Sequence, residues 1–426
     1  MELFLFAVAF FGMLFLNVPI AMSMGLSSVF YLFMTGDFFM MSITAPRFFA
    51  GMNSFSMLAI PLFILSGDLL CSGKASKLLI DMANSMVGHF KGGLSSVTTV
   101  ACMFFGAVSG SGAATASAIG SVVAPEAERS GYDKSFIAAI IAAAGPLGIL
   151  IPPSIPMVVY GAATDTSIGE LLLAGIGPGV LFGLMLIFYG RWVSSKNGYG
   201  EIASFEWGRV INTSKKAFWA LLTPVIIVGG IYSGYFTPTE AAAVAAVYSM
   251  IVGLFIYRTL GFRDLPAIFL KSAVSSAVIM FVVGGVVLFG WVLTREQIPQ
   301  TLTTMILANV TSPIMFLLIA DMVILVAGML MDPSPAIILF APLLLPAATA
   351  FNIDPVFFGA LMVTNLAIGL TTPPVALTLY VASRVCEVSM YRLIKHIFPV
   401  VVLLILGLLI LTFFPQIAMF IPNLLM

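Results

Sequence analysis

Charged residues are scarce in this chain: Asp, Glu, Lys and Arg make up 8% of its 426 residues. Soluble domains carry about 25%. Hydrophobic residues make up 61%, and apolar runs of about 20 residues, the length that crosses a bilayer, recur from end to end. The formal net charge of zero gives no sign of a nucleic-acid partner. The composition predicts an all-α polytopic protein that lies in a lipid bilayer.

Cysteine and histidine are also rare, which argues against several functions. The three cysteines have no CxxC spacing, so neither a disulfide framework nor a metal site is expected. A membrane serine protease needs a base beside its nucleophile. The two histidines, His89 and His396, are expected near the cytoplasmic interface, far from the mid-membrane serines. There is also no phosphate-binding Walker motif. We therefore expect no enzyme, and transport driven by ion gradients.

Two interruptions of the hydrophobic segments match each other. The stretch Gly148-Ile-Leu-Ile-Pro-Pro153 recurs as Gly369-Leu-Thr-Thr-Pro-Pro374, a shift of 221 residues. The same shift also aligns Pro125 with Pro346, Asp133 with Asp354, Phe136 with Phe357 and Ala139 with Ala360. Because Gly and Pro punctuate structure, we interpret the match as an internal duplication rather than chance likeness among apolar helices.

A broken backbone within a membrane persists only where protein buries it or where it lines a wet cavity. A matched pair of breaks in two halves of a chain indicates the binding site of a secondary transporter.

Each break follows a segment that we predict to be a re-entrant hairpin. Gly93–Pro125 lies between basic residues at both ends and has a Ser109-Gly-Ser-Gly112 tip, so we expect it to enter from the cytoplasm. Pro313–Ala348 has a Met331-Asp-Pro-Ser-Pro335 tip and no flanking Lys or Arg, so we expect it to enter from the periplasm. Two hairpins that insert from opposite faces make the repeat an inverted one.

The tips and breaks offer oxygen ligands for small cations. Helix ends and unwound carbonyls within a membrane coordinate Na⁺ in transporters of this kind. In the first half the candidate oxygens come from Ser109, Ser111, Gly148, Ile151 and Pro153. In the second half they come from Asp332, from Thr371 or Thr372, and from the backbone near Gly369 and Pro374. The alternative is that these Gly and Ser clusters only allow tight helix packing.

Several ionisable residues near the membrane leave their roles open. Asp332 lies deep in an apolar run, where a carboxylate is a functional candidate, and it could equally cap the second helix of its hairpin. Arg295 follows the predicted span Ser275–Leu293 and could attract an anionic substrate or pair with Glu296. Asp68, Asp165 and Asp321 have no assigned role.

The motifs resemble those of the large membrane subunit of tripartite ATP-independent periplasmic (TRAP) transporters. The likeness covers essentially the whole chain and is carried by Phe105–Gly112, Gly145–Pro153 and Asn365–Pro374. Within this family the chain looks most like members that handle sialic acid. The resemblance implies Na⁺-coupled uptake of an organic acid across the inner membrane of a Gram-negative bacterium. It also implies an elevator mechanism.

The same resemblance implies partners, ions and site residues. The partners are a small four-helix membrane subunit, expected as a separate chain because this one begins at its first span, and a periplasmic substrate-binding protein. At least two Na⁺ are expected. Their family ligands match Ser109, Gly148, Ile151 and Pro153 in one site and Asp332, Gly369, Thr372 and Pro374 in the other. The substrate path is expected at Gly110, Ser111, Gly112, Arg295 and Thr371.

We predict a division into moving and static parts. Residues 54–164 and 275–384 form the transport domain, each part with one hairpin and one broken helix. Residues 1–53 form scaffold helices and an arm, 165–274 form further scaffold, and 385–426 form a C-terminal scaffold helix. Three alternatives stay open: a TRAP substrate that is a C4-dicarboxylate or another carboxylate, a stand-alone Na⁺/anion symporter, and a channel.

Overall fold

The computed structural model describes residues 2–16, 18–71, 75–199 and 205–425. Within these ranges every regular element is helical, which confirms the predicted all-α class. Seven described helices are long and apolar enough to cross a membrane. The number becomes eight if Thr44–Met52 and Ser56–Cys71, which meet at 59°, count as one span.

The helices follow one another with short connections. The first half contains α1 (Glu2–Phe15), α2 (Ile20–Met34), α3 (Phe38–Ser42), α4 (Thr44–Met52), η1 (Ser56–Leu58), α5 (Ala59–Cys71), α6 (Ala75–Val87), α7 (Gly93–Ser109), α8 (Gly112–Arg129), α9 (Lys134–Ala144), η2 (Gly145–Ile149), α10 (Ile155–Thr164), α11 (Ile168–Ala174) and α12 (Ile176–Asn197). The second half contains α13 (Trp207–Tyr232), α14 (Pro238–Ile251), η3 (Val252–Ile256), α15 (Leu265–Arg295), α16 (Ile298–Asn309), α17 (Pro313–Leu330), α18 (Pro333–Ala350), α19 (Pro355–Gly369), α20 (Leu377–Val385), α21 (Met390–Phe413) and α22 (Gln416–Leu425).

Both predicted hairpin tips are present, and local chemistry explains each. In the first hairpin Gly110 ends α7 with a φ of +62°, a conformation that glycine adopts without strain. The Ser111 hydroxyl then accepts a hydrogen bond from the Ala114 N–H and caps α8. In the second hairpin the Asp332 carboxylate caps α18 by accepting from the Ser334 N–H at 3.3 Å. Pro333 opens that helix, where a missing N–H costs nothing.

Both predicted breaks are also present. The first broken helix consists of α9, the short 3₁₀ segment η2 and then α10, which begins after the Ser154 cap. The second consists of α19, which ends at Gly369, and α20, which begins at Leu377. The Pro152–Pro153 and Pro373–Pro374 bonds within these breaks are cis.

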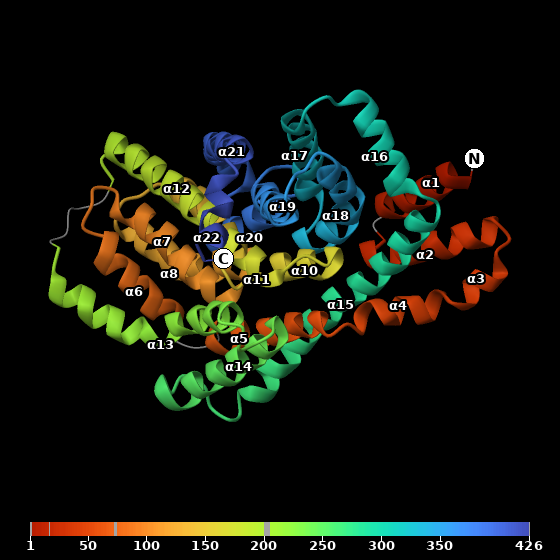
Figure 1. The fold of residues 1–426 in the computed structure, drawn as a ribbon. Helices are drawn as coiled ribbons and strands as arrows, with labels where there is room; N and C mark the ends of the chain where they lie inside the picture. The colour runs from red at the N-terminus through yellow and green to blue at the C-terminus, as the bar shows by residue number, and fades with distance from the viewer. Residues whose placement is uncertain (1, 17, 72–74, 200–204, 426) are drawn as a thin grey trace.

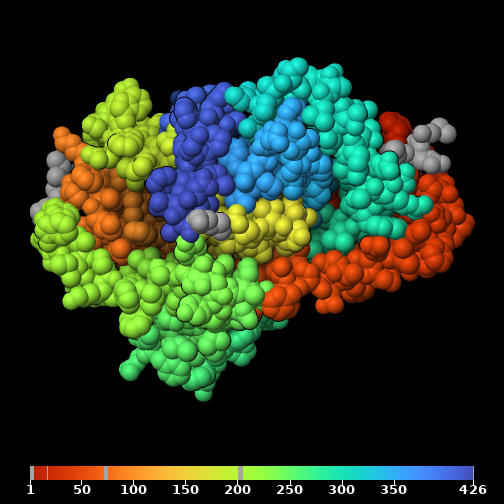
Figure 2. Space-filling model, viewed as in Figure 1, coloured from red at the N-terminus to blue at the C-terminus, as the bar shows by residue number. Residues whose placement is uncertain are grey.

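The helices pack into an inner body and an outer frame. The inner body contains the hairpins and broken helices together with α11, α12, α21 and α22: α12 packs on α7, and α21 packs on α9 and α19. In the frame α15 packs on α2, α4 and α5, and α14 packs on α5 and α13. Figure 1 shows α13, α14, α5, α15 and α4 along the lower side of the inner body. In the space-filling view α13 and α14 form a lobe below it (Figure 2).

Some predicted boundaries differ from the observed elements. Helix α15 starts at Leu265 and is longer than the predicted span Ser275–Leu293, so the predicted boundary at 274/275 lies inside a continuous helix. The charge of Lys271 hid this continuity, because its long side chain can extend to water from within a helix. The C-terminal region forms two helices, α21 and α22, where one was predicted. The division into moving and static parts concerns motion and stays a prediction.

Candidate functional site

Both hairpin tips and both helix breaks meet at one cavity of about 130 Å³, here called the tip cavity. Its described lining from the first half comes from the tip residues Gly110 to Ala113 and from Ile149, Ile155 and Pro156 beside the break. Its lining from the second half comes from Asp332, Pro333, Ser334, Leu370 and Leu377, and α15 adds Ile279. Segments more than 200 residues apart in the sequence therefore form a single site.

Glycines allow this convergence, because each broken helix touches its hairpin backbone to backbone. A Cβ on Gly106 would lie 2.2 Å from the Gly148 Cα. In the other half a Cβ on Gly369 would lie 2.6 Å from the Gly328 Cα. Any side chain at these contacts would push the hairpin away from the break. Gly148 and Gly369 were predicted from the matched breaks, whereas their contacts with Gly106 in α7 and Gly328 in α17 were not.

Oxygen atoms gather beside Gly148 in the first half. The hydroxyls of Ser109 and Thr115 lie 2.9 Å apart, and Thr115 donates to the Ser111 carbonyl at 2.7 Å. A Cβ on Gly148 would lie 2.7 Å from the Thr115 Oγ1. The Pro153 carbonyl is close to the same tip, because a Cβ on Gly110 would lie 2.8 Å from it. Oxygen ligands of this kind suit a hard cation such as Na⁺.

Thr115 belongs to this cluster and was missed by the sequence analysis. It lies in α8, three residues beyond the predicted Ser109–Gly112 tip, and it is fully buried. A threonine one helical turn after an N-cap serine faces back toward the tip, and that spacing was the available signal. Ile151, predicted to contribute its backbone carbonyl, packs its side chain against Gly179 of α12.

The second half presents Asp332 and two buried threonines. Asp332 is exposed to the tip cavity and caps α18, so the predicted capping role is confirmed. Thr371 and Thr372 are buried and donate their hydroxyl hydrogens to the Ile368 carbonyl at 2.7 and 2.8 Å. Their oxygens keep lone pairs for a cation. Pro374 is exposed, and Gly369 is buried against Gly328.

Arg295 has a different partner from the one expected. Its Nη2 lies 2.6 Å from the Asp37 Oδ2, whereas the two predicted alternatives were a pairing with Glu296 and attraction of an anionic substrate. The guanidinium and the Met40 N–H hold the pKa of Asp37 below its usual value. Arg295 is absent from the described lining of the tip cavity. Its ion pair joins the end of α15 to the turn before α3.

The three unassigned acids have distinct surroundings. Asp68 pairs with Lys271, whose Nζ lies 2.6 Å from Oδ1. Asp165 ends α10 with a φ of +56°. Asp321 is buried in α17, where its side chain meets the Thr412 hydroxyl at 2.7 Å and the Asn365 amide at 3.1 Å. Asp321 thus links α17 of the second hairpin by hydrogen bonds to α19 of the second broken helix and to α21.

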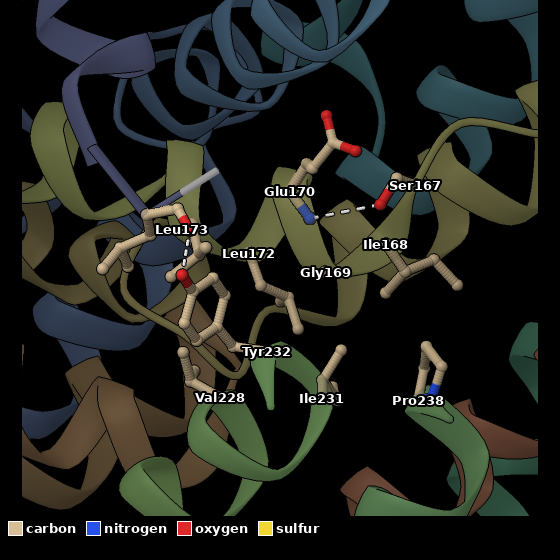
Figure 3. Close-up of a pocket in the computed structure, with 11 residues that line it drawn as sticks. Ser167, Ile168, Gly169, Glu170, Leu172, Leu173, Val228, Ile231, Tyr232 and Pro238 are labelled. Carbon is tan, nitrogen blue, oxygen red and sulfur yellow. Dashed lines mark hydrogen bonds between the residues drawn. The ribbon is translucent and has the colours of Figure 1, made fainter. Parts of the chain in front are cut away.

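A separate cavity of about 530 Å³ lies between the inner body and the frame, where α11 faces α13 and the start of α14. Figure 3 shows Ser167 accepting from the Glu170 N–H, with Val228 and Ile231 on the α13 side. The Tyr232 hydroxyl donates to the Leu425 carbonyl. The lining of this cavity is mostly apolar and contains no tip residue. It is a gap between two packed bodies and supplies no ligand to the tip cavity.

Comparisons with known proteins identify the family. Residues 7–417 match the family described as "Tripartite ATP-independent periplasmic transporter, DctM component". This chain belongs to that family. It is 44% identical over 382 residues, 89% of each chain, to the C4-dicarboxylate TRAP transporter large permease protein DctM of Pseudomonas aeruginosa. It is 36% identical to the sialic acid TRAP transporter large permease protein SiaM of Vibrio cholerae, over 97% of this chain and 96% of the relative.

The fold is shared with a solved transporter structure. The YdaH transporter of Alcanivorax borkumensis superposes with a TM-score of 0.59 over 89% of this chain and 88% of its own, at 13% identity. The TRAP chain is therefore a multi-pass membrane permease with a transporter fold, and its relatives are named as permeases rather than enzymes. The sialic acid type is not established, because a C4-dicarboxylate relative is the more similar of the two.

Proposed function

We propose that this chain is the large permease subunit of a Na⁺-coupled TRAP transporter that imports an organic acid, a C4-dicarboxylate first among the candidates. A periplasmic binding protein would deliver the acid, and a small membrane subunit would complete the permease in the inner membrane. The observation that carries the proposal is the tip cavity, where two hairpin tips and two broken helices meet. Such discontinuous helices at a repeat interface are where secondary transporters bind substrate and coupling ions.

Two Na⁺ would bind beside this cavity, one in each half. The first would use the oxygens of Ser109, Thr115 and Ser111, which cluster beside Gly148, and the Pro153 carbonyl beside Gly110. The second would use the Asp332 carboxylate and oxygens from the break after Gly369. With these charges in place, the amides at the tips and the bound cations would attract a carboxylate between them. Gly110, Ser111 and Gly112, which line the tip cavity, would then border the substrate. Thr371, predicted on the same path, is fully buried and absent from the described lining.

The moving body of an elevator would be the inner body. Its helices α7 to α12 and α17 to α22 pack on one another, and α12 and α21 contact the hairpins and broken helices directly. We therefore propose that α11, α12, α21 and α22 travel with the site. The frame helix α5 would stay with α14 and α15, on which it packs. This division differs from the predicted one, because α5, α6, the later part of α15 and α16 leave the moving part and α11, α12, α21 and α22 join it.

The relatives with the higher identity support a C4-dicarboxylate as the substrate class. A C4-dicarboxylate permease is 44% identical and a sialic acid permease 36% identical. Within the described chain the tip cavity has no cationic lining residue. Bound Na⁺ and helix N-termini would therefore supply the positive potential, which suits carboxylates of several shapes. N-acetylneuraminate stays the second candidate substrate.

Reconstituted uptake tests the proposal. The chain, its small subunit and its binding protein are placed in proteoliposomes with an inward Na⁺ gradient, and uptake of labelled succinate and N-acetylneuraminate is measured. Na⁺-dependent succinate uptake that needs both partners is expected. Uptake by this chain alone would favour a stand-alone symporter. Flux that ignores Na⁺ and exceeds the rate of any conformational cycle would favour a channel.

A further inference from the structure

A second cavity, of about 450 Å³, continues from the tip cavity. The two share Ser111, Ile155 and Ile279 in their lining. The Ser109 side of the first hairpin also borders the second cavity. We call this second space the side cavity. The side cavity is larger than the tip cavity, so a substrate or ion bound between the tips has room to leave through the side cavity.

The side cavity runs away from the tips between three helices. Along α8 its lining is Ser111, Ala114, Ser117, Ala118 and Ser121, one helix face that extends about 15 Å from the tip at 1.5 Å per residue. Along α15 it passes from Ile279 through Ser275 to Lys271, a rise of about 12 Å. Because both rows begin at the tip cavity, the side cavity is elongated along them and has Lys271 at its far end.

Helix α5 forms the third wall and meets the first hairpin where Na⁺ is proposed to bind. A Cβ on Gly67 would lie 3.1 Å from the Ser109 carbonyl, so α5 approaches this tip closely. The next residue, Asp68, and Cys71, one turn further along, line the cavity. A frame helix thus borders both the proposed ion site and the outer part of the side cavity.

Among the described residues that line the side cavity, Lys271 on α15 is the one that carries a positive charge. Its Nζ lies 2.6 Å from the Asp68 Oδ1, and the Ser272 hydroxyl donates to Oδ2 at 2.8 Å. The Lys271 side chain is 67% exposed, whereas Asp68 is 15% exposed. The Lys271 end of the pair is exposed to water, which weakens its attraction to Asp68. A second carboxylate can therefore compete for the ammonium group while Ser272 continues to hold Asp68.

We infer that the side cavity is the route between the tip cavity and the cytoplasm, and that Lys271 binds the carboxylate of the transported acid along it, in exchange for Asp68. That the anion bound by Lys271 is an organic acid rests on the proposed function. The positive charges near Lys271 indicate that this route opens to the cytoplasm. Lys271 lies eight residues beyond Arg263 and thirteen beyond Arg258, and such basic segments flank spans on the cytoplasmic side. A departing organic acid thus meets an ammonium group before it reaches bulk water.

We expect substitutions of Lys271 and of Asp68 to change the affinity for succinate on the cytoplasmic side in opposite directions. Lys271→Gln removes the ammonium, so the KM for succinate on the cytoplasmic side rises several-fold, and Lys271→Arg restores it. Asp68→Asn removes the competing carboxylate, so the same KM falls. Loss of a merely structural ion pair would move both variants in the same direction. Lys77→Gln, at an exposed position in α6, is the matched control and leaves the KM unchanged.

Succinate exchange in proteoliposomes that contain the complete transporter measures these constants, with N-acetylneuraminate as the second probe. An unchanged KM in Lys271→Gln, or equal changes in Lys271→Gln and Asp68→Asn, overturns the role of Lys271.

Cysteine labelling tests the route without any substrate. Ser121 is exposed and lines the side cavity. A membrane-impermeant maleimide should label Ser121→Cys, made in a Cys71→Ser chain, in inside-out vesicles and spare it in right-side-out vesicles, with the Cys71→Ser chain alone as the background. Labelling from the periplasmic face, or from neither face, overturns the route. Because this readout needs no transport, cytoplasmic labelling combined with absent uptake would sink the proposed function and leave the route standing.

Discussion

Gly106 and Gly148 lie backbone to backbone, so close that a Cβ on Gly106 would reach within 2.2 Å of the Gly148 Cα. The contact sets the distance between the first hairpin and its broken helix. Gly328 and Gly369 make the corresponding contact in the second half. Since both pairs lie within about one helical turn of a tip or a break, they hold the oxygens of the site in register.

A methyl group added at either glycine contact should displace the hairpin from its broken helix and so move the proposed Na⁺ ligands, although the substitution itself removes no oxygen atom. Gly106→Ala and Gly369→Ala should each cost about 1–3 kcal/mol through overpacking, because backbone atoms cannot turn aside as side chains can. We expect a lower Tm of the solubilised protein and weaker Na⁺ activation. Gly229→Ala is the control, since a Cβ there meets no heavy atom within 4 Å. Equal Tm values in all three variants would refute the close contact.

The hydroxyl cluster in the first half predicts Na⁺ affinity. Removal of one ligand oxygen by Ser109→Ala or Thr115→Val should raise the half-saturating Na⁺ concentration about tenfold, which corresponds to about 1.4 kcal/mol. Thr99→Val, also buried and also in α7, should leave it unchanged, because that hydroxyl donates only to the Ser95 carbonyl in its own helix. Na⁺ activation curves for succinate uptake provide the measurement. Identical curves for Thr99→Val and Thr115→Val would remove Thr115 from the ion site.

Asp332 combines a capping role with a proposed ion role, and two substitutions separate them. Asn is as good an N-cap as Asp, so Asp332→Asn should keep the Tm and lose Na⁺ activation. Asp332→Ala should lose both, with the missing cap costing about 1 kcal/mol. Asp354→Asn is the matched control, because Asp354 caps α19 in the same way, with Oδ1 accepting from the Val356 and Phe357 N–H groups. Normal Na⁺ activation in Asp332→Asn would limit Asp332 to capping.

The positions of the tips and breaks were predictable from the sequence, because they depend on residues that change the local backbone geometry. Glycine, proline and N-cap residues act locally, so the tips at Ser109–Gly112 and Met331–Pro335 and the breaks at Gly148 and Gly369 were predictable from the chain alone. Pairings between distant helices were not. The Lys271–Asp68 bridge joins residues 203 positions apart, and Thr412 meets Asp321 across 91 positions. Ordinary polar residues in apolar helices carry no sign of their partner.

The number of Na⁺ ions can be read from the effect of membrane potential on two substrates of different charge. With two Na⁺, succinate enters as a neutral complex because it is mainly a dianion at neutral pH, whereas N-acetylneuraminate enters with one net positive charge. At about 100 mV that charge adds ~2.3 kcal/mol. A tenfold Na⁺ gradient alone gives ~1.4 kcal/mol per ion. Succinate could then accumulate by about two decades, and the monoanion by between three and four.

An inside-negative K⁺ diffusion potential, set with valinomycin, should therefore stimulate N-acetylneuraminate uptake and leave succinate uptake unchanged. Valinomycin with equal K⁺ on both sides is the control. If the potential also drives succinate, more than two positive charges accompany the dianion, and the two halves of the tip cavity do not hold all the coupling ions. In that case the buried carboxylate of Asp321, which meets only neutral groups in its described hydrogen bonds, becomes the next position to substitute. Asp321→Asn would then have to abolish the response of succinate uptake to voltage.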